Sequence, residues 1–89
     1  MRWSSRMSEV VYRIQSPCEC QALLEAELDE NRNVVRGWAR FDDASERAPA
    51  NSVGPERSRF DVVWQCPMCG RDTLRVFYAG ALRRLPALT

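Results

Sequence analysis

Cys66-Pro67-Met68-Cys69-Gly70 is the stretch on which the fold of this chain depends. Two cysteines separated by two residues can place both thiolates on one tetrahedral metal ion, because the turn between them folds back and points both side chains inward. Pro67 presets the turn, and Gly70 supplies the positive φ that lets backbone amides face the thiolates. The stretch therefore predicts one half of a metal site.

A second pair of cysteines, in Cys18-Glu19-Cys20, supplies the other half of the expected site. The chain has four cysteines and no histidine, so these thiols are its only soft metal ligands. Two pairs of thiolates on one ion form a closed site, in which protein atoms fill every position. We therefore expect one ion held by Cys18, Cys20, Cys66 and Cys69.

The length of 89 residues fits one small domain, in which a bound metal would contribute a large share of the stability. An apolar content of 45% is ordinary for a globular chain. No apolar run approaches the roughly 20 residues of a membrane-spanning helix. Residues 1–10 also lack the hydrophobic segment of a secretory signal. We therefore expect a cytoplasmic protein without membrane contact, whose reduced cysteines bind metal rather than form disulfides.

The charged residues argue against an enzyme. All thirteen basic residues are arginine. The lack of lysine and histidine removes Schiff-base chemistry, the usual general base and every Ser-His or Cys-His nucleophile, so we expect neither catalysis nor a small-molecule substrate. The net charge of +1 gives no overall attraction to nucleic acid, and residues 19–30 carry five acidic side chains and no basic one.

Three stretches rich in β-branched and aromatic residues are predicted to be strands that frame the cysteines. They are residues 10–15 (V-V-Y-R-I-Q), 59–65 (R-F-D-V-V-W-Q) and 73–78 (T-L-R-V-F-Y). The first two each run into a knuckle, meaning the turn that carries a cysteine pair, which gives a faint internal repeat. The side chains expected in the core around the metal are Tyr12, Ile14, Phe60, Val62, Trp64, Leu74 and Val76.

Residues 21–41 allow two interpretations. Residues 21–30 are good helix formers, yet their apolar side chains alternate with period two. The turn-forming residues 31–33 follow, and residues 34–41 have the composition of a strand in which Gly37 marks a bulge or a close approach of two backbones. We expect a β-hairpin over residues 21–41, and an acidic helix over 21–30 is the alternative.

The remaining segments show no pattern of a regular element. Residues 1–8 are expected to be a flexible N-terminal segment. Residues 42–58 are rich in Asp, Pro, Ala and Ser and are predicted to be a long solvated loop inside one domain that spans residues 9–79. Pro86 prevents a helix through residues 80–89, which are expected to be a C-terminal tail.

The second half of the chain resembles a zinc ribbon, a family of small four-cysteine metal-binding domains with rubredoxin-like knuckles. The order strand, C-P-x-C-G, strand is the family's second knuckle, matched here by residues 66–70. The first knuckle in the family is usually C-x-x-C followed by glycine. This chain has C-E-C followed by Gln21, and Glu19 is a substitute ligand if one of these two cysteines stays outside the site. Over residues 10–79 the resemblance implies a mostly β fold: a small antiparallel sheet built from hairpins with two metal knuckles around Zn²⁺, with iron as the alternative.

The resemblance specifies the fold more strongly than the function. We expect a structural zinc-binding module that acts as a small subunit or adaptor in a larger protein assembly. Three alternatives stay open: a nucleic-acid-binding zinc ribbon, a rubredoxin-like iron electron carrier, and a thiol redox sensor, which would need a helix that starts inside the C-P-M-C motif. The candidate partner-binding side chains are Arg36, Trp38, Arg40, Arg71 and Arg75.

Overall fold

The mostly β fold expected from the sequence is confirmed. The computed structural model describes residues 10–85; the predicted segment 1–8 and the end of the predicted tail lie outside this range. No helix between residues 10 and 85 is long and apolar enough to cross a membrane. The elements are β1 (Tyr12–Pro17), β2 (Leu23–Leu28), β3 (Val34–Phe41), β4 (Ala44–Arg47), β5 (Ala50–Val53), β6 (Arg59–Gln65), β7 (Asp72–Tyr78) and the 3-10 turn η2 (Ala79–Ala81).

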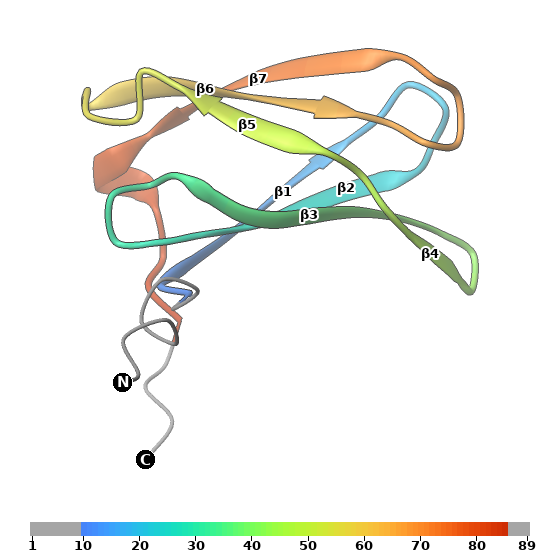
Figure 1. Cartoon of the computed structure of the whole chain (residues 1–89), viewed down its shortest axis with the longest axis horizontal. Coiled ribbons are helices and arrows are strands. Elements are labelled where there is room, and N and C mark those ends of the chain that lie inside the picture. The colour runs from blue at the N-terminus through green and yellow to red at the C-terminus, as the bar shows by residue number, and fades with distance from the viewer. Residues whose placement is uncertain (1–9, 86–89) are drawn as a thin grey trace, which may run out of the picture.

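The strands form two antiparallel sheets rather than one. Sheet A has the order β1-β2-β3-β4 and sheet B the order β5-β6-β7, and Figure 1 shows sheet B lying over sheet A. The chain crosses from one sheet to the other at a corner between β4 and β5, where the Ala48 N–H donates to the Gly37 carbonyl (3.0 Å) and the Gln65 N–H to the Pro49 carbonyl (2.8 Å). The close approach predicted at Gly37 is confirmed, because a Cβ there would lie 2.6 Å from the Ala48 carbonyl oxygen.

The hydrophobic core lies between the two sheets. Phe60 and Trp64 of β6 are its largest buried side chains, and Leu24 and Leu28 of β2 are buried with them. The Trp64 indole N–H donates to the Glu25 backbone carbonyl (3.1 Å), so the one polar atom of this side chain has a partner. Of the predicted core residues, Ile14, Phe60, Val62 and Trp64 are buried and Tyr12 is half-buried against them.

β2 and β3 form the hairpin predicted over residues 21–41, so the alternative of an acidic helix is wrong. The Asp29 carboxylate closes the turn by accepting the backbone N–H groups of Asn31 and Asn33, each at 2.9 Å. Residues 23–28 form a strand although they are good helix formers, because their alternating apolar side chains make one face of β2 that the core side chains of sheet B cover.

Residues 42–58 differ from the predicted long loop, because they contain β4 and β5. All four side chains of β4 are exposed, and the strand is held by its pairing with β3. β5 pairs with β6, and its first residue, Ala50, would lie only 3.1 Å from a Cβ added at Gly37. Neither strand carries an alternating apolar pattern, so a prediction from side-chain periodicity misses both.

The prediction that Leu74 and Val76 belong to the core is wrong, since their side chains are 55% and 41% exposed. The pairing of β6 with β7 sets Thr73 opposite Trp64 and Phe77 opposite Phe60, and directly opposite residues share a face. Thr73, Arg75 and Phe77 therefore face sheet A. The stretch T-L-R-V-F-Y has apolar residues on both faces, so its composition does not decide which face is buried.

The described part of the predicted C-terminal tail returns to the start of β1. The Leu85 N–H donates to the Val11 carbonyl (2.8 Å), and the Arg84 guanidinium carbon lies 5.7 Å from the Tyr12 ring centroid. Leu82 packs against the core. Up to residue 85 this segment therefore belongs to the folded domain.

Candidate metal centre

The two knuckles lie at the same end of the two sheets (Figure 1). In the second knuckle, which joins β6 to β7, the Cys66 N–H donates to the Arg71 carbonyl (2.9 Å) and the Gly70 N–H to the Cys66 carbonyl (2.8 Å). Gly70 has a φ of 77°, as the sequence predicts. This left-handed residue directly follows the second cysteine and reverses the chain.

The first knuckle, which joins β1 to β2, repeats this arrangement with one residue fewer. The Cys18 N–H donates to the Ala22 carbonyl (2.8 Å), and the Gln21 N–H donates to the Cys18 carbonyl (2.9 Å). Gln21 has a φ of 79°, so it takes the position and conformation of Gly70 without being glycine. The short C-E-C spacer therefore shortens the knuckle by one residue and keeps the left-handed residue directly after the second cysteine.

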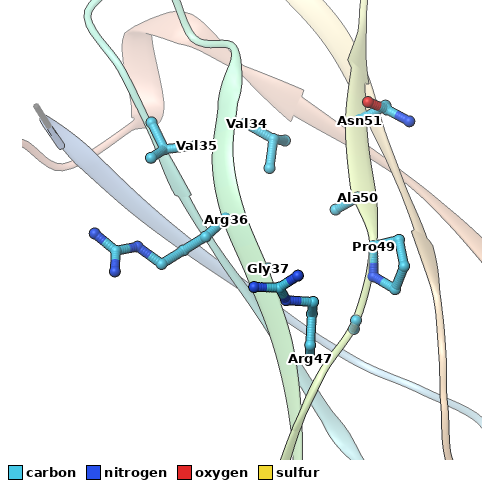
Figure 2. A pocket seen from close by; sticks show the side chains of 9 residues that line it. Val34, Val35, Arg36, Gly37, Arg47, Pro49, Ala50 and Asn51 are labelled. Atoms are coloured by element: carbon cyan, nitrogen blue, oxygen red, sulfur yellow. The ribbon is translucent and has the colours of Figure 1, made fainter. Parts of the chain in front are cut away.

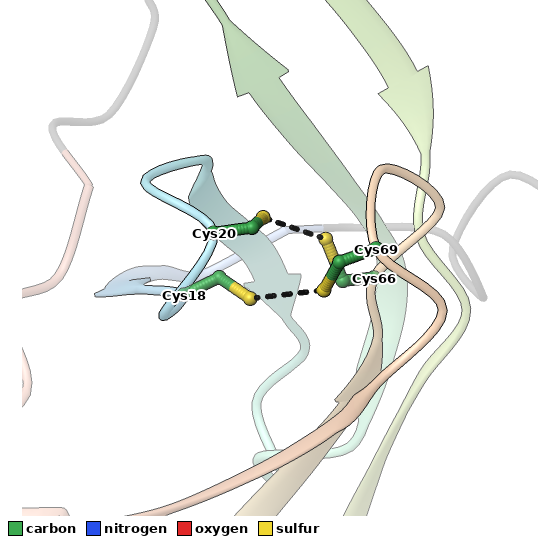
Figure 3. Close-up of side chains that lie close together, drawn as sticks. All are labelled: Cys18, Cys20, Cys66 and Cys69. Atoms are coloured by element: carbon green, nitrogen blue, oxygen red, sulfur yellow. Dashed lines mark hydrogen bonds between the residues drawn. The ribbon is translucent and has the colours of Figure 1, made fainter.

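The four cysteine side chains point toward one another (Figure 3), and their sulfur atoms all lie within 4.8 Å of each other. The Cys18 and Cys69 sulfurs are 3.7 Å apart, as are those of Cys20 and Cys66. A tetrahedron of sulfurs at a metal distance of about 2.3 Å has an edge of roughly 3.8 Å. The donor set and its spacing therefore fit one tetrahedral metal ion, and four sulfurs suit zinc and iron alike.

Backbone amides surround these sulfurs, and the thiols do not share one pKa. The pKa of Cys18 is lowered to about 6, first by the Cys20 backbone N–H that donates to its sulfur and also by the Thr73 hydroxyl at 3.8 Å. The Ala22 backbone N–H acts in the same direction on Cys20, but burial and the neighbouring sulfurs outweigh it and raise the pKa of Cys20 to about 12.

The pKa of Cys69, like that of Cys20, is raised. The Arg71 backbone N–H lowers this pKa, but burial and the sulfurs of Cys18 and Cys66 together raise it by more. Several thiolates in one cluster repel each other, so they ionise together only when a cation neutralises them. The cluster is thus suited to a bound cation, and Cys18 loses its proton before Cys20 and Cys69 do.

Glu19, the substitute ligand suggested by the sequence, is not part of the cluster. Its side chain is 76% exposed and forms an ion pair with Arg71 across the two knuckles. Cys18 and Cys66 are buried, Cys20 is half-buried and Cys69 is exposed. An ion at this place would therefore be enclosed on the side of the core and lie near the surface at Cys69.

The five candidate partner-binding residues fall into two groups. Arg71 and Arg75 line a cleft of about 190 Å³ beside Cys18, and Arg75 donates to the Pro17 carbonyl (3.3 Å). The other three lie on the outer face of sheet A. They are Arg36, Trp38 and Arg40, which β3 sets opposite Glu27, Glu25 and Leu23.

Carboxylates of β2 neutralise much of the arginine charge on this outer face. Glu25 is buried and accepts from Arg40 (2.9 Å), while Glu27 accepts from Arg36 (2.7 Å) and Arg13 (2.9 Å). The guanidinium carbon of Arg13 also lies 5.8 Å from the Trp38 ring centroid. The arginine and tryptophan side chains are therefore already engaged within the sheet.

A separate groove of about 420 Å³ lies at the corner between β3 and β5, where Figure 2 shows Val34 and Ala50 on the two strands. Its charged lining residues are Arg36 and Arg47, and none of its lining residues is a cysteine, carboxylate or hydroxyl residue. The groove therefore offers neither a metal ligand nor a nucleophile.

Two features of the site were not found from the sequence. Thr73 reaches the Cys18 sulfur through the pairing of β6 with β7, and no spacing in the sequence signals that contact. The conformation of Gln21 is signalled only when C-E-C-Q is aligned with C-P-M-C-G, since both put the left-handed residue after the second cysteine.

No protein-family model, curated protein or solved structure matches this chain. Its site is therefore interpreted from the geometry of the four cysteines.

Proposed function

We propose that the protein is a structural zinc-binding module of the zinc-ribbon kind that acts as a small subunit or adaptor in a larger protein assembly. The observation that supports this most is the meeting of four thiols from two knuckles of different sheets within 4.8 Å. Four thiolates leave a tetrahedral ion no open position for a substrate, which is the mark of a structural rather than a catalytic site. When bound, the ion would join sheet A to sheet B.

The size of the domain supports a structural role for the metal. A structural zinc site contributes roughly 10–16 kcal/mol of apparent binding energy, whereas the net stability of a whole domain is about 5–15 kcal/mol. Apart from the core, the chain links the two sheets at the corner of residues 48–49 and again where Arg84 and Leu85 pair with the start of β1. Loss of the ion therefore removes as much free energy as the fold has in reserve.

The metal-removal experiment uses Cys69→Ser and a strong chelator on natively purified protein. Both treatments are expected to abolish the dispersed amide signals of the folded domain. The variant leaves only three thiolates, which hold zinc more weakly than four, and the chelator removes the ion itself. Pro67→Ala is a matched control in the same turn: Pro67 is exposed and carries no ligand atom, so this variant should keep its metal. Dispersed signals after chelation would refute the structural role.

Metal analysis of the same protein distinguishes zinc from the rubredoxin-like alternative. Zinc gives a colourless protein, whereas iron between four thiolates gives a coloured one that changes on reduction. Free thiols are kept reduced in the cytoplasm, and this compartment fits the proposal. Identification of the proteins that co-purify tests the adaptor role.

Nucleic-acid binding is the second candidate function, and its support is the row of Arg36, Trp38 and Arg40 on one face. We favour a protein partner because Glu25 and Glu27 neutralise these arginines and the net charge of the chain is only +1. We expect no retention on heparin at low salt. Binding to DNA or RNA that weakens steeply with salt would favour the second function.

A further inference from the structure

The four cysteines of the candidate metal centre differ in their access to solvent. Cys69 is exposed and Cys20 is half-buried, whereas Cys18 and Cys66 are buried. Susceptibility of a cysteine to oxidation follows its exposure and its thiolate character. A small oxidant therefore reaches the Cys69 sulfur directly from solvent.

The two sulfur contacts of 3.7 Å both join one knuckle to the other. They pair Cys18 with Cys69 and Cys20 with Cys66, so each cysteine is used once (Figure 3). A disulfide bond is about 2.0 Å long, so each sulfur has to move by less than about 1 Å to form one. Both pairs are therefore close enough to become disulfides between sheet A and sheet B.

Pairing within a knuckle is less favourable than pairing between the knuckles. The redox sensor suggested by the sequence needs a helix that starts inside C-P-M-C, but residues 67–69 form a turn and no helix starts between residues 66 and 72. The two pairs between the knuckles are separated by 51 and 46 positions in the chain. In the chain-entropy account, a disulfide that closes a longer loop removes more freedom from the unfolded chain and stabilises the fold more.

We propose that the metal centre is also a peroxide-sensitive switch, in which oxidation replaces the ion between the sheets by the disulfides Cys18–Cys69 and Cys20–Cys66. The inference rests on the proposed function, since it starts from four cysteines that hold zinc as thiolates. The oxidant is hydrogen peroxide or another small hydroperoxide. Cys69 is the first sulfur that it oxidises, and Cys18 is the sulfur that resolves the product.

The chemistry balances with two peroxides per chain. The Cys69 thiolate attacks one oxygen of hydrogen peroxide, the O–O bond breaks, and hydroxide leaves, so Cys69 becomes a sulfenic acid. The Cys18 thiolate then attacks the Cys69 sulfur, the S–O bond breaks, and a second hydroxide leaves. Each hydroxide takes up a proton to give water. The two sulfurs lose two electrons, which reduce the peroxide, and a second peroxide closes the bond between Cys20 and Cys66 in the same way.

Oxidation and chelation both remove the metal, but their effects on the fold are expected to be opposite. The oxidised chain has no thiolate left to bind zinc, so one zinc per chain is released. The two disulfides take over the link between the sheets, and the oxidised protein keeps its dispersed amide signals. The reduced protein loses these signals when a chelator removes the ion, because nothing then replaces the link.

The test adds hydrogen peroxide to reduced, zinc-loaded protein and follows released zinc with a chromogenic indicator, amide dispersion by NMR and disulfides by peptide mass. Trypsin cleaves after arginine, so the first knuckle lies in the peptide of residues 14–32 and the second in the peptide of residues 60–71. Disulfides between the knuckles join these two peptides, and fragmentation of the joined pair assigns each bond. Disulfides within the knuckles leave the peptides separate. With less than one peroxide per chain, the bond between Cys18 and Cys69 should be the main product.

Several results would overturn the switch. They are separate peptides, zinc that stays bound after oxidation, and an oxidised protein without dispersed signals. A bond between Cys20 and Cys66 that forms first would refute Cys69 as the first site of oxidation. Zinc is measured before peroxide is added: a folded, reduced protein without zinc refutes the proposed function, whereas zinc-loaded protein that gives separate peptides refutes the switch alone.

Discussion

Gly37→Ala should destabilise the domain, because it pushes the two sheets apart at the corner. The new Cβ would lie 2.6 Å from the Ala48 carbonyl oxygen and 3.1 Å from the Ala50 Cβ. Both neighbours belong to the backbone or start directly on it, so no flexible side chain can move aside. Overpacking costs about 1–3 kcal/mol and a strained hydrogen bond up to about 1 kcal/mol more, and we expect a loss of roughly 2–3 kcal/mol.

Thermal unfolding at fixed free metal concentration measures this effect. A domain of this size loses about 4–8 °C in Tm per kcal/mol, so the variant should melt about 10–20 °C below the parent protein. Gly80→Ala is the matched control, since a Cβ at Gly80 meets nothing within 4 Å and its φ is not in the left-handed region. A change of less than about 2 °C in Gly37→Ala would refute the close packing of β3 against the corner.

Three further predictions concern the knuckles and the buried carboxylate. Gln21→Gly should stabilise the protein by about 0.5–1 kcal/mol and Gly70→Ala should destabilise it by a similar amount, because both positions have a left-handed backbone that glycine adopts without strain. Thermal unfolding measures both changes, and a destabilised Gln21→Gly or a stabilised Gly70→Ala would contradict the reasoning. Metal affinity should fall at least about 100-fold as the pH drops by one unit from 8, because the raised pKa values of Cys20 and Cys69 mean that binding displaces a proton from each. Competition with a chelator measures the affinity, and a fall of about ten-fold or less over this pH unit would contradict the prediction. Glu25→Gln should lower the free energy of unfolding by about 1–3 kcal/mol, because the buried side chain at this position would no longer carry the negative charge that pairs with Arg40. Denaturant unfolding measures this loss, and an unchanged midpoint would contradict the prediction.

The four-cysteine cluster could be predicted from the sequence because the chemistry of each cysteine pair is local. Cysteine spacing, the proline and Gly70 encode the second knuckle, and the lack of other soft ligands points to Cys18 and Cys20. The hairpin over residues 21–41 could be predicted because the turn residues lie beside a period-two pattern. The hairpin and each knuckle depend on residues close together in the chain, and the lack of other soft ligands brings the two knuckles together in the prediction.

The features that the sequence did not reveal depend on distant pairing. β4 and β5 are strands because β3 and β6 present backbone groups to them, and their own side chains carry no signal. The exposure of Leu74 and Val76 follows from the register of β7, which the knuckle sets. An apolar strand whose two faces are alike cannot show from composition which face meets the core and which is exposed.

The central proposal is that four thiolates from two sheets close around one zinc ion. X-ray absorption at the metal edge of natively purified protein tests it most directly. The proposal predicts one zinc per chain in a single shell of four sulfurs at about 2.3 Å, with no oxygen or nitrogen ligand. A shell of two sulfurs completed by oxygen, or a folded protein that carries no metal, would contradict it.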